Sequence, residues 1–375
     1  ARATGIARLV VAAESAREAC LPTTLAGGAG LDVVPLVRLA DLRRLGTPGE
    51  PKPLPSERAP EPPAGALPDL ADLRGQPALR GALEVAAAGS HGLLVVGPPG
   101  AGKSLAARRL PSIMPPLEPA EALDVMRIAS ACGRAASTHH TRRPFRAPHH
   151  TISPAGLVGG GSPPRPGEVT LAHRGVLFLD ELGEFARGAL EALRQPLEDG
   201  EVTITRARHS VCLPSRFLLV AASNPCPCGR GEDSADCECS PAAARRYRTR
   251  ISGALADRID ISLAVEQPSA DSLAGERGEG SEAVRERVVT ARRRALERQG
   301  APNAELDPAG ARRHARLTSA ARRELAAGHR AMGLSGRGHD RVLRVARTLA
   351  DLRGCERVDH DAIAGALGFR RREAE

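Results

Sequence analysis

The sequence is poor in aromatic residues and in long apolar runs. It has no tryptophan, one tyrosine and five phenylalanines among 375 residues, so platforms for base stacking are not expected, and any nucleic-acid contact would be directed mainly at phosphates. No apolar run approaches the roughly 18 residues of a membrane-spanning helix, which indicates a soluble protein with no membrane partner. The first residues lack the charged-then-apolar pattern of a secretory signal, and this predicts a cytoplasmic location.

Lysine is also scarce, because Lys52 and Lys103 are the only two in the chain. Arginine therefore supplies 51 of the 53 lysine and arginine side chains, which exceed the 44 acidic ones and give a formal net charge of +9. This charge favours a polyanionic partner such as DNA, although an arginine excess can equally reflect codon composition. The length predicts two or three domains. Because the chain begins Ala-Arg-Ala inside what resembles a folded segment, we expect it to be part of a longer protein.

The strongest signal is a phosphate-binding loop that follows an apolar strand. Leu93–Val96 predicts a buried strand, and Lys103–Leu110 predicts the following helix. Between them the glycines let backbone N–H groups turn onto phosphate oxygens. Lys103 would reach the β- and γ-phosphates, and the Ser104 hydroxyl would ligate Mg²⁺. The sequence thus predicts binding of ATP and Mg²⁺ by Gly97, Pro98, Pro99, Gly100, Ala101, Gly102, Lys103 and Ser104.

Two further strand-like runs end in polar residues. Val176–Leu179 is followed by Asp180 and Glu181, of which Asp180 would hold Mg²⁺ and Glu181 would polarise the water that attacks the γ-phosphate. The alternative is a core strand that ends at two solvated carboxylates. Residues 217–222 form a third apolar run that leads to Asn224. An amide there can bind the γ-phosphate and the water, although an asparagine before proline is by itself usually a turn residue.

Together these strands resemble an AAA+ ATPase, and more narrowly a magnesium-chelatase-like protein of the YifB/ComM family. The resemblance covers nearly the whole chain. The motifs that carry it are DLRGQ at 72–76, RPFRAPHH at 143–150, GLVGGG at 156–161, PGE at 166–168, LAHRG at 171–175, NPCPCG at 224–229, RISG at 250–253 and DRID at 257–260.

The resemblance implies an α/β fold with an AAA+ P-loop NTPase core built on a parallel sheet. We expect this core over residues 69–265 and a small all-α lid domain over residues 266–375. Residues 47–68 contain eight prolines, which predicts a semi-rigid linker. Residues 1–46 resemble the end of a Lon-protease-like α+β domain. In that segment the sequence predicts strands at 9–12 and 31–36 and helices at 14–21 and 39–45.

The resemblance also implies several catalytic roles. Asn224 would be the sensor of the γ-phosphate. Arg258 would be an arginine finger that projects into the ATP site of the next subunit in a homo-oligomeric ring, expected to be a hexamer. A surface ion pair of Arg258 with Asp257 or Asp260 is the competing interpretation. On the predicted lid helix, Arg337 resembles the second sensor.

That lid helix has an apolar stripe at Val342, Val345, Ala346 and Leu349. Its remaining arginines are predicted outside the stripe, and two of them are alternatives to Arg337 as the second sensor. These arginines are Arg341, Arg344 and Arg347. Arg341 and Arg344 are the two alternatives for the second sensor.

Two insertions are candidates for contacts with DNA in a central pore. The alternating run 201–205, the basic residues Arg206, Arg208 and His209, and the run 211–213 predict a β-hairpin with a basic tip. A hairpin that is merely solvated is equally compatible with the pattern. The glycine-rich stretch 156–167 would be a second pore element.

Four of the eight cysteines form a C-x-C…C-x-C pattern at Cys226, Cys228, Cys237 and Cys239. In a cytosolic protein such clustering favours a metal over a disulfide, and four thiolates can hold a structural Zn²⁺ tetrahedrally. Four reduced thiols in a flexible loop are the alternative. The paired histidines are predicted to be solvated or to contact phosphate, not to bind metal: His139, His140, His149 and His150.

The sequence and the resemblance therefore predict an ATP hydrolase that remodels DNA, by helicase-like branch migration in recombination or natural transformation. Two other functions stay open. One is a chelatase-type motor that remodels a protein partner for metal insertion into a tetrapyrrole. The other is a non-motor nucleotide switch or protease-associated regulator.

Overall fold

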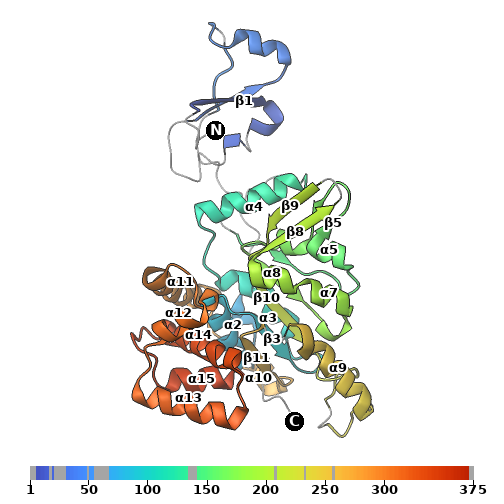
Figure 1. Cartoon of the computed structure of the whole chain (residues 1–375), viewed down its shortest axis with the longest axis vertical. Helices are drawn as coiled ribbons and strands as arrows, with labels where there is room; N and C mark the ends of the chain where they lie inside the picture. Colours follow the sequence, from blue (N-terminus) through green and yellow to red (C-terminus); the bar gives the residue numbers. More distant parts are fainter. Residues whose placement is uncertain are drawn as a thin grey trace. The chain divides into compact units, whose positions relative to one another are not determined.

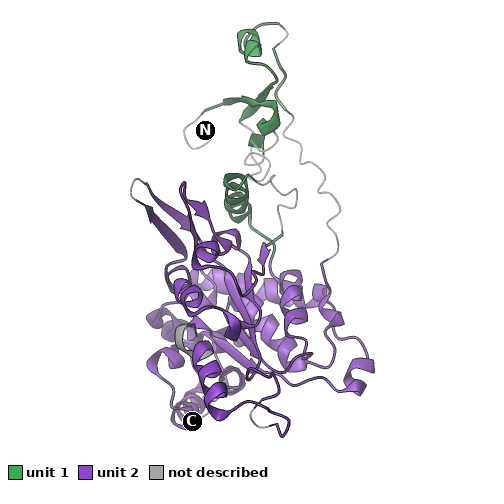
Figure 2. Ribbon diagram, turned by 90° about the vertical axis from the view of Figure 1, so that its right-hand side faces the viewer, with its two compact units in different colours: residues 1–65, 116–142 green, residues 66–115, 143–375 purple. Residues whose placement is uncertain are grey.

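The computed structural model describes residues 6–16, 19–20, 31–48, 50–54, 67–133, 142–206, 209–231, 234–255 and 258–370. The chain divides into two compact units (Figure 2). One comprises residues 1–65 and 116–142, and the other comprises residues 66–115 and 143–375. Among the described helices, none is both long and apolar enough to cross a bilayer.

The first unit contains a pair of parallel strands, β1 (Arg8–Ala12) and β2 (Asp32–Leu36). Their valines favour extended backbone, and Val33 and Val34 are buried. The predicted helix at 39–45 is instead a 3₁₀ helix, Leu39–Arg44, without a buried residue that would support a longer α-helix. The predicted helix at 14–21 is helical at 13–16 and 19–20, and its other residues lie outside the described part, as do 55–66 of the predicted linker. Helix α4 (Pro119–Ala131) also belongs to this unit.

A five-stranded parallel sheet forms the centre of the second unit (Figure 1). In chain order its strands are β3 (Leu93–Val96), β4 (Phe145–Arg146), β7 (Val176–Leu179), β10 (Leu218–Ser223) and β11 (Ile261–Ala264). Their spatial order is β11-β3-β10-β7-β4. The fourth strand along the chain thus lies between the first and the third, so the ends of β3, β10 and β7 are adjacent at one edge.

Both faces of this sheet are buried, because successive side chains of each strand enter different cores. Val176 and Phe178 of β7 join one core, and Leu177 and Leu179 join the other. The first core is completed by α2 (Pro77–Gly89), α3 (Lys103–Ile113) and C-terminal helices. The second core receives residues from four short elements and one longer helix. The short elements are α5 (Pro154–Val158), α6 (Glu168–Leu171), the 3₁₀ helix Leu182–Glu184 and α7 (Arg187–Ala192), and the longer helix is α9 (Pro241–Ala254).

The predicted β-hairpin is present as β8 (Glu201–Arg206) and β9 (His209–Pro214), which follow α8 (Arg194–Asp199). Val202 and Ile204 on one face of β8 are buried in the second core and anchor the hairpin. Arg208 and the side chains of Arg206 and His209 lie outside the described residues. The glycine-rich stretch forms a second, smaller hairpin, β5 (Gly159–Gly160) with β6 (Arg165–Pro166).

Beyond β11 the chain is helical up to residue 370, the last one described. The helices are α10 (Ala270–Ala274), α11 (Ser281–Gln299), α12 (Pro308–Ala315), α13 (Ser319–Met332), α14 (Gly336–Leu352) and α15 (His360–Gly368), with a 3₁₀ helix, Asn303–Glu305, between α11 and α12. Another 3₁₀ helix, Leu70–Asp72, precedes α2. Helices α11 and α14 pack on α2. The side chain of Ser335 caps α14 by accepting a hydrogen bond from the backbone N–H of Gly338.

The prediction that the arginines of α14 lie outside its buried face is wrong for two of them. Arg341 and Arg347 are 5% and 1% exposed. Arg347 donates to the backbone carbonyls of Cys355 and Glu356 and lies 3.0 Å from an Asp351 carboxylate oxygen. Carbonyls and one carboxylate pair with the two Nη atoms of this guanidinium, while its buried Nε has no hydrogen-bond partner among the described residues. Periodicity alone does not reveal such an arrangement.

A buried polar network joins α14 to the sheet. Asp351, 2% exposed, also accepts hydrogen bonds from Arg298 and from the side chain of Asn303. Asn303 donates to Thr348, whose hydroxyl lies 2.7 Å from Nε2 of His91, the residue two positions before β3. Nδ1 of His91 lies 2.8 Å from Asp260, immediately before β11. The network fixes the helical region against the amino-terminal ends of β3 and β11.

We expect Asp351→Ala to lower the free energy of unfolding by about 3–5 kcal/mol, because it removes the buried carboxylate that pairs with Arg298 and Arg347. Glu356→Ala is the matched control, since the Glu356 side chain is 79% exposed beside Arg316 and its loss should cost at most about 1 kcal/mol. Urea unfolding followed by circular dichroism measures both. Equal shifts of the two midpoints would contradict a stabilising role for the network.

Candidate nucleotide-binding site

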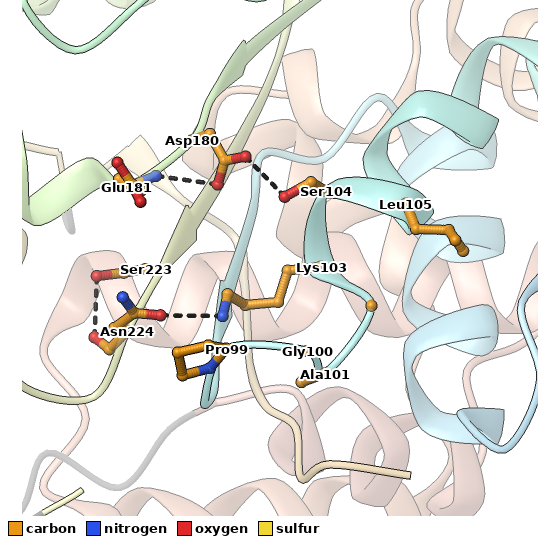
Figure 3. A pocket seen from close by; sticks show the side chains of 11 residues that line it. Pro99, Gly100, Ala101, Lys103, Ser104, Leu105, Asp180, Glu181, Ser223 and Asn224 are labelled. Carbon is orange, nitrogen blue, oxygen red and sulfur yellow. Dashed lines mark hydrogen bonds between the residues drawn. The ribbon is translucent and has the colours of Figure 1, made fainter. Parts of the chain in front are cut away.

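Most of the predicted ATP-site residues meet in one pocket at the carboxyl ends of β3, β10 and β7, which the predicted Gly97 and Pro98 do not line. The pocket has a volume of about 360 Å³, within the range of sites that hold a small organic ligand. It is lined by residues 99–105 of the phosphate-binding loop and by Asp180, Glu181, Ser223 and Asn224 (Figure 3). All of these except Leu105 and Ser223 were predicted from sequence.

The phosphate-binding loop needs glycine for two separate reasons. Gly100 and Gly102 have φ values of 80° and 82°, a left-handed region where other residues are strained. Gly97 passes close to the end of β11, and a Cβ there would lie 2.4 Å from the carbonyl oxygen of Val265. Helix α3 then begins at Lys103, so its amino terminus and unpaired N–H groups point at the pocket.

Lys103 is held in this loop by oxygen atoms of residues that directly follow β3 and β10. Its ammonium donates to the carbonyls of Gly97 at 2.7 Å and Pro98 at 2.9 Å, and to Oδ1 of Asn224 at 3.1 Å. Partial burial lowers the pKa of Lys103, while the charges of Asp180 and Glu181 raise it. All three bonds can be redirected to phosphate oxygens, which carry more negative charge than carbonyls.

The two predicted magnesium ligands face each other. The Ser104 hydroxyl donates to a carboxylate oxygen of Asp180 across 2.6 Å. Adjacent oxygen ligands of an octahedral Mg²⁺, each at about 2.1 Å from the ion, lie about 3 Å apart. Small movements would therefore let both oxygens coordinate one ion, and the hard oxygen donors fit Mg²⁺ in kind.

Glu181 adopts a left-handed backbone conformation, with φ 53° and ψ 50°. This turn directs its N–H to Oδ1 of Asp180, 3.0 Å away, and leaves its side chain on the pocket wall. Oε2 of Glu181 lies 3.3 Å from Nδ1 of His150, in the loop that follows β4. Sequence alone did not predict this contact, because it depends on β4 being the neighbour of β7. A histidine beside Glu181 can orient that carboxylate by hydrogen bonding.

Asn224 directly follows β10, between the phosphate-binding loop and Asp180. The only tyrosine of the chain, Tyr247 of α9, packs behind it. Burial raises the pKa of the Tyr247 phenol, while hydrogen bonds with the Ser223 side chain and the Asn224 backbone lower it. A Cβ on Gly183 would lie 2.3 Å from the Tyr247 ring. Tyr247 thus supports Asn224, a role for which the sequence holds no local signal.

The segment 72–76, which resembles a part that packs around adenine, lies against the phosphate-binding loop. Gln76 is 7% exposed and donates to the carbonyls of Ala101 at 3.3 Å and Glu266 at 2.6 Å. Gln76 therefore ties the loop to the segment after β11.

Arg258 does not line this pocket. It lies three residues before β11, and its carbonyl lies beside Gly92, the residue before β3. Arg258 is thus at the opposite edge of the sheet from the phosphate-binding loop, separated by the four-residue strand β3, which spans about 13 Å. Its guanidinium pairs with Glu198 of α8 and not with Asp260, which contacts His91; Asp257 lies outside the described residues.

Three other arginines surround Arg258. Burial lowers the pKa of Arg258, and the charges of Arg337, Arg341 and Arg194 lower it further. The two predicted catalytic arginines, Arg258 and Arg337, therefore lie close to each other and away from the pocket of their own chain. A concentration of positive charge of this kind attracts an anionic group.

We expect Lys103→Ala to abolish detectable ATP binding, because no other described residue of the pocket offers an ammonium to the β- and γ-phosphates. Glu181→Gln should retain ATP binding and lose hydrolysis by about 10²–10⁴-fold, since an amide cannot accept a proton from water. Lys52→Ala removes the only other lysine, an exposed one, and is the matched control. Titration with a fluorescent ATP analogue and steady-state phosphate release measure the two effects. Normal ATP affinity of Lys103→Ala would contradict the assignment of the site.

Two family models match the chain, and the first of them includes the pocket. The sequence profile of magnesium chelatase subunit ChlI matches residues 69–273, and that of the C-terminal region of the same subunit matches residues 278–370. The first match contains all of the pocket residues named above.

Similar proteins occur in several bacteria. The chain is 47% identical over 309 residues to an uncharacterized protein of Mycobacterium tuberculosis, a match that covers 80% of this chain and 61% of the relative. It is 44% identical over 305 residues to competence protein ComM of Haemophilus influenzae, and 41% identical over 305 residues to protein YifB of Escherichia coli. Each of these two matches covers 80% of this chain and 60% of the relative. This chain thus spans about three fifths of the length of these relatives.

Proposed function

Because the chain belongs to the ChlI-like magnesium chelatase family of AAA+ ATPases, with YifB and ComM among its relatives, we propose that it is a ring-forming ATPase that remodels DNA. The finer activity proposed is helicase-like branch migration in recombination or natural transformation. The main support for ATP hydrolysis is that Lys103, Asp180 and Asn224 line the same pocket. The relative named competence protein ComM supports the choice of DNA.

The residues of the pocket divide the chemistry among them. Lys103 and the N–H groups of the loop bind the β- and γ-phosphates. Ser104 and Asp180 would hold Mg²⁺, which would supply positive charge to neutralise the phosphates. Glu181 takes up the proton of the attacking water. Asn224 lies between Lys103 and the strand of Glu181, where its amide contacts both the γ-phosphate and that water.

Completion of the site would require a second copy of the chain. Arg258 and Arg337 lie near the sheet edge opposite the pocket, and in a head-to-tail ring this edge faces the pocket of the next subunit. An arginine delivered there meets the charge that develops on the γ-phosphate in the transition state, an effect worth roughly 10³–10⁵ in turnover. We propose a homo-oligomeric ring, a hexamer, in which each pocket receives Arg258 from its neighbour.

The contact with DNA is proposed for the two hairpins. In hairpin β8–β9 the backbone of Arg206 pairs with that of His209, and Arg208, between them in the sequence, lies outside the described residues. Strand β6 carries the exposed Arg165. Both hairpins belong to the face of the sheet that is opposite α2 and the C-terminal helices. A pore that grips phosphates through arginine depends strongly on salt and weakly on base sequence.

A chelatase-type motor acting on a protein partner is the second candidate. The family description supports it, as does a 29% identity over 153 residues to the magnesium-chelatase 38 kDa subunit of Rhodobacter capsulatus. That match covers 36% of this chain, against 80% for ComM. The longer and stronger similarity favours the DNA motor.

We expect single-stranded or branched DNA to stimulate the steady-state ATPase severalfold at low salt, and added salt to weaken this stimulation as phosphate contacts are screened. Glu181→Gln should remove the stimulated rate. Arg165→Ala with Arg206→Ala and Arg208→Ala should remove stimulation and leave the basal rate. Hydrolysis indifferent to DNA would refute the DNA motor and favour a protein partner, or a nucleotide switch if protein has no effect either.

Mixing two inactive variants tests the shared site. Arg258→Ala chains keep an intact pocket, and Lys103→Ala chains keep an intact Arg258. We expect each variant alone to be inactive. The mixture should recover part of the activity, at interfaces where the pocket of an Arg258→Ala chain receives Arg258 from a Lys103→Ala chain. Arg187→Ala, which removes an exposed arginine paired with Glu191, should leave the activity unchanged. A mixture that stays inactive would show that Arg258 does not act across a subunit interface.

A further inference from the structure

The four clustered cysteines lie within reach of one metal ion. Their sulfur atoms all lie within 4.8 Å of one another, and none of them is in a disulfide. Three of the separations are 3.3 Å for Cys226 to Cys228, 3.8 Å for Cys226 to Cys237 and 3.7 Å for Cys228 to Cys237. In a tetrahedral zinc tetrathiolate with bonds of about 2.3 Å, the sulfur atoms are about 3.8 Å apart. A disulfide would need about 2.05 Å.

The backbone around the cluster is arranged to support thiolates. The N–H of Gly231 donates to the sulfur of Cys226 at 3.2 Å, and the N–H of Cys228 donates to that of Cys239 at 3.3 Å. Such bonds to sulfur orient metal ligands and offset their negative charge. Arg230 donates to the carbonyl of Asp236 at 3.0 Å and so joins the first C-x-C pair to the second.

The same loop contacts the nucleotide pocket. Cys226 is completely buried two residues after Asn224. Gly229, with φ 83°, turns back onto the phosphate-binding loop, where a Cβ would lie 2.9 Å from the Pro99 ring and 3.9 Å from Cγ of Asn224. The N–H of Gly229 donates to the carbonyl of Cys226 at 3.0 Å. The position of Asn224 relative to Pro99 therefore depends on the conformation of this cysteine loop.

We propose that Cys226, Cys228, Cys237 and Cys239 bind one structural Zn²⁺, and that the metal holds Asn224 in place to distinguish ATP from ADP. Each thiol releases its proton when it binds the metal, and the ion undergoes no redox change. The proposal of a metal site is based on the distances between the four sulfur atoms. Its effect on nucleotide selection rests on the proposed function of Asn224.

Metal content tests the first part without nucleotide or DNA. We expect one zinc per chain by mass spectrometry of the purified protein after dialysis against EDTA, and its release as a mercurial titrates the cluster thiols in the Cys212→Ser, Cys355→Ser variant. Co²⁺ substituted for zinc should give the strong visible bands of tetrahedral thiolate coordination. Cys226→Ser with Cys228→Ser should lose the metal, and Cys212→Ser with Cys355→Ser should keep it. Protein that contains no zinc, or that contains iron instead, would overturn the proposal.

Nucleotide binding tests the second part. We expect the Cys226→Ser, Cys228→Ser variant to bind ADP normally and to lose its preference for a non-hydrolysable ATP analogue, as Asn224→Ala does while retaining zinc. If the double variant does not fold, Cys228→His is used instead, because zinc accepts three cysteines and one histidine; it should keep both zinc and the preference. Loss of zinc with an unchanged preference for the ATP analogue would refute the link to Asn224. An ATPase that DNA fails to stimulate would leave the metal result untouched.

Discussion

The insertion of β10 between β3 and β7 is the constraint on which the site depends. Parallel strands present their carboxyl ends at one edge of a sheet, so this order places Asn224 between the phosphate-binding loop and Asp180. The hydrogen bonds from Lys103 to Asn224 and from Ser104 to Asp180 are its direct result. A sheet with another strand order could contain the same three motifs without bringing them to one pocket.

The same sheet also separates the nucleotide pocket from Arg258. The pocket is at the carboxyl edge, whereas Arg258 stands before β11 at the amino edge, across the length of β3. Within one chain, therefore, Arg258 cannot reach a phosphate that is bound in the pocket. This separation gives a physical reason for proposing a ring, because a neighbouring chain is the simplest source of a guanidinium at each pocket.

Some arginine side chains are buried in this lysine-poor protein. Arg347 is buried to 1% exposure on backbone carbonyls and Asp351, and Arg298 reaches the same carboxylate from α11. A planar guanidinium can donate to several acceptors at once in this way, while a compact ammonium lacks this fixed fork of donors. The helical region is thereby joined to the sheet through charged groups as well as apolar packing, which links the edge that carries Arg258 to α14.

Sequence by itself determined the local elements of the site: the apolar run and glycines before Lys103, the strand that delivers Asp180 and Glu181, the hairpin after residue 200 and the four-cysteine pattern. These signals are local because each depends on residues close together in the chain. Tertiary structure decided what required neighbours from distant segments. It placed His150 beside Glu181, Tyr247 behind Asn224, and Gly229 against Pro99. It also buried Arg347, because strand order and helix packing determine such contacts and periodicity does not.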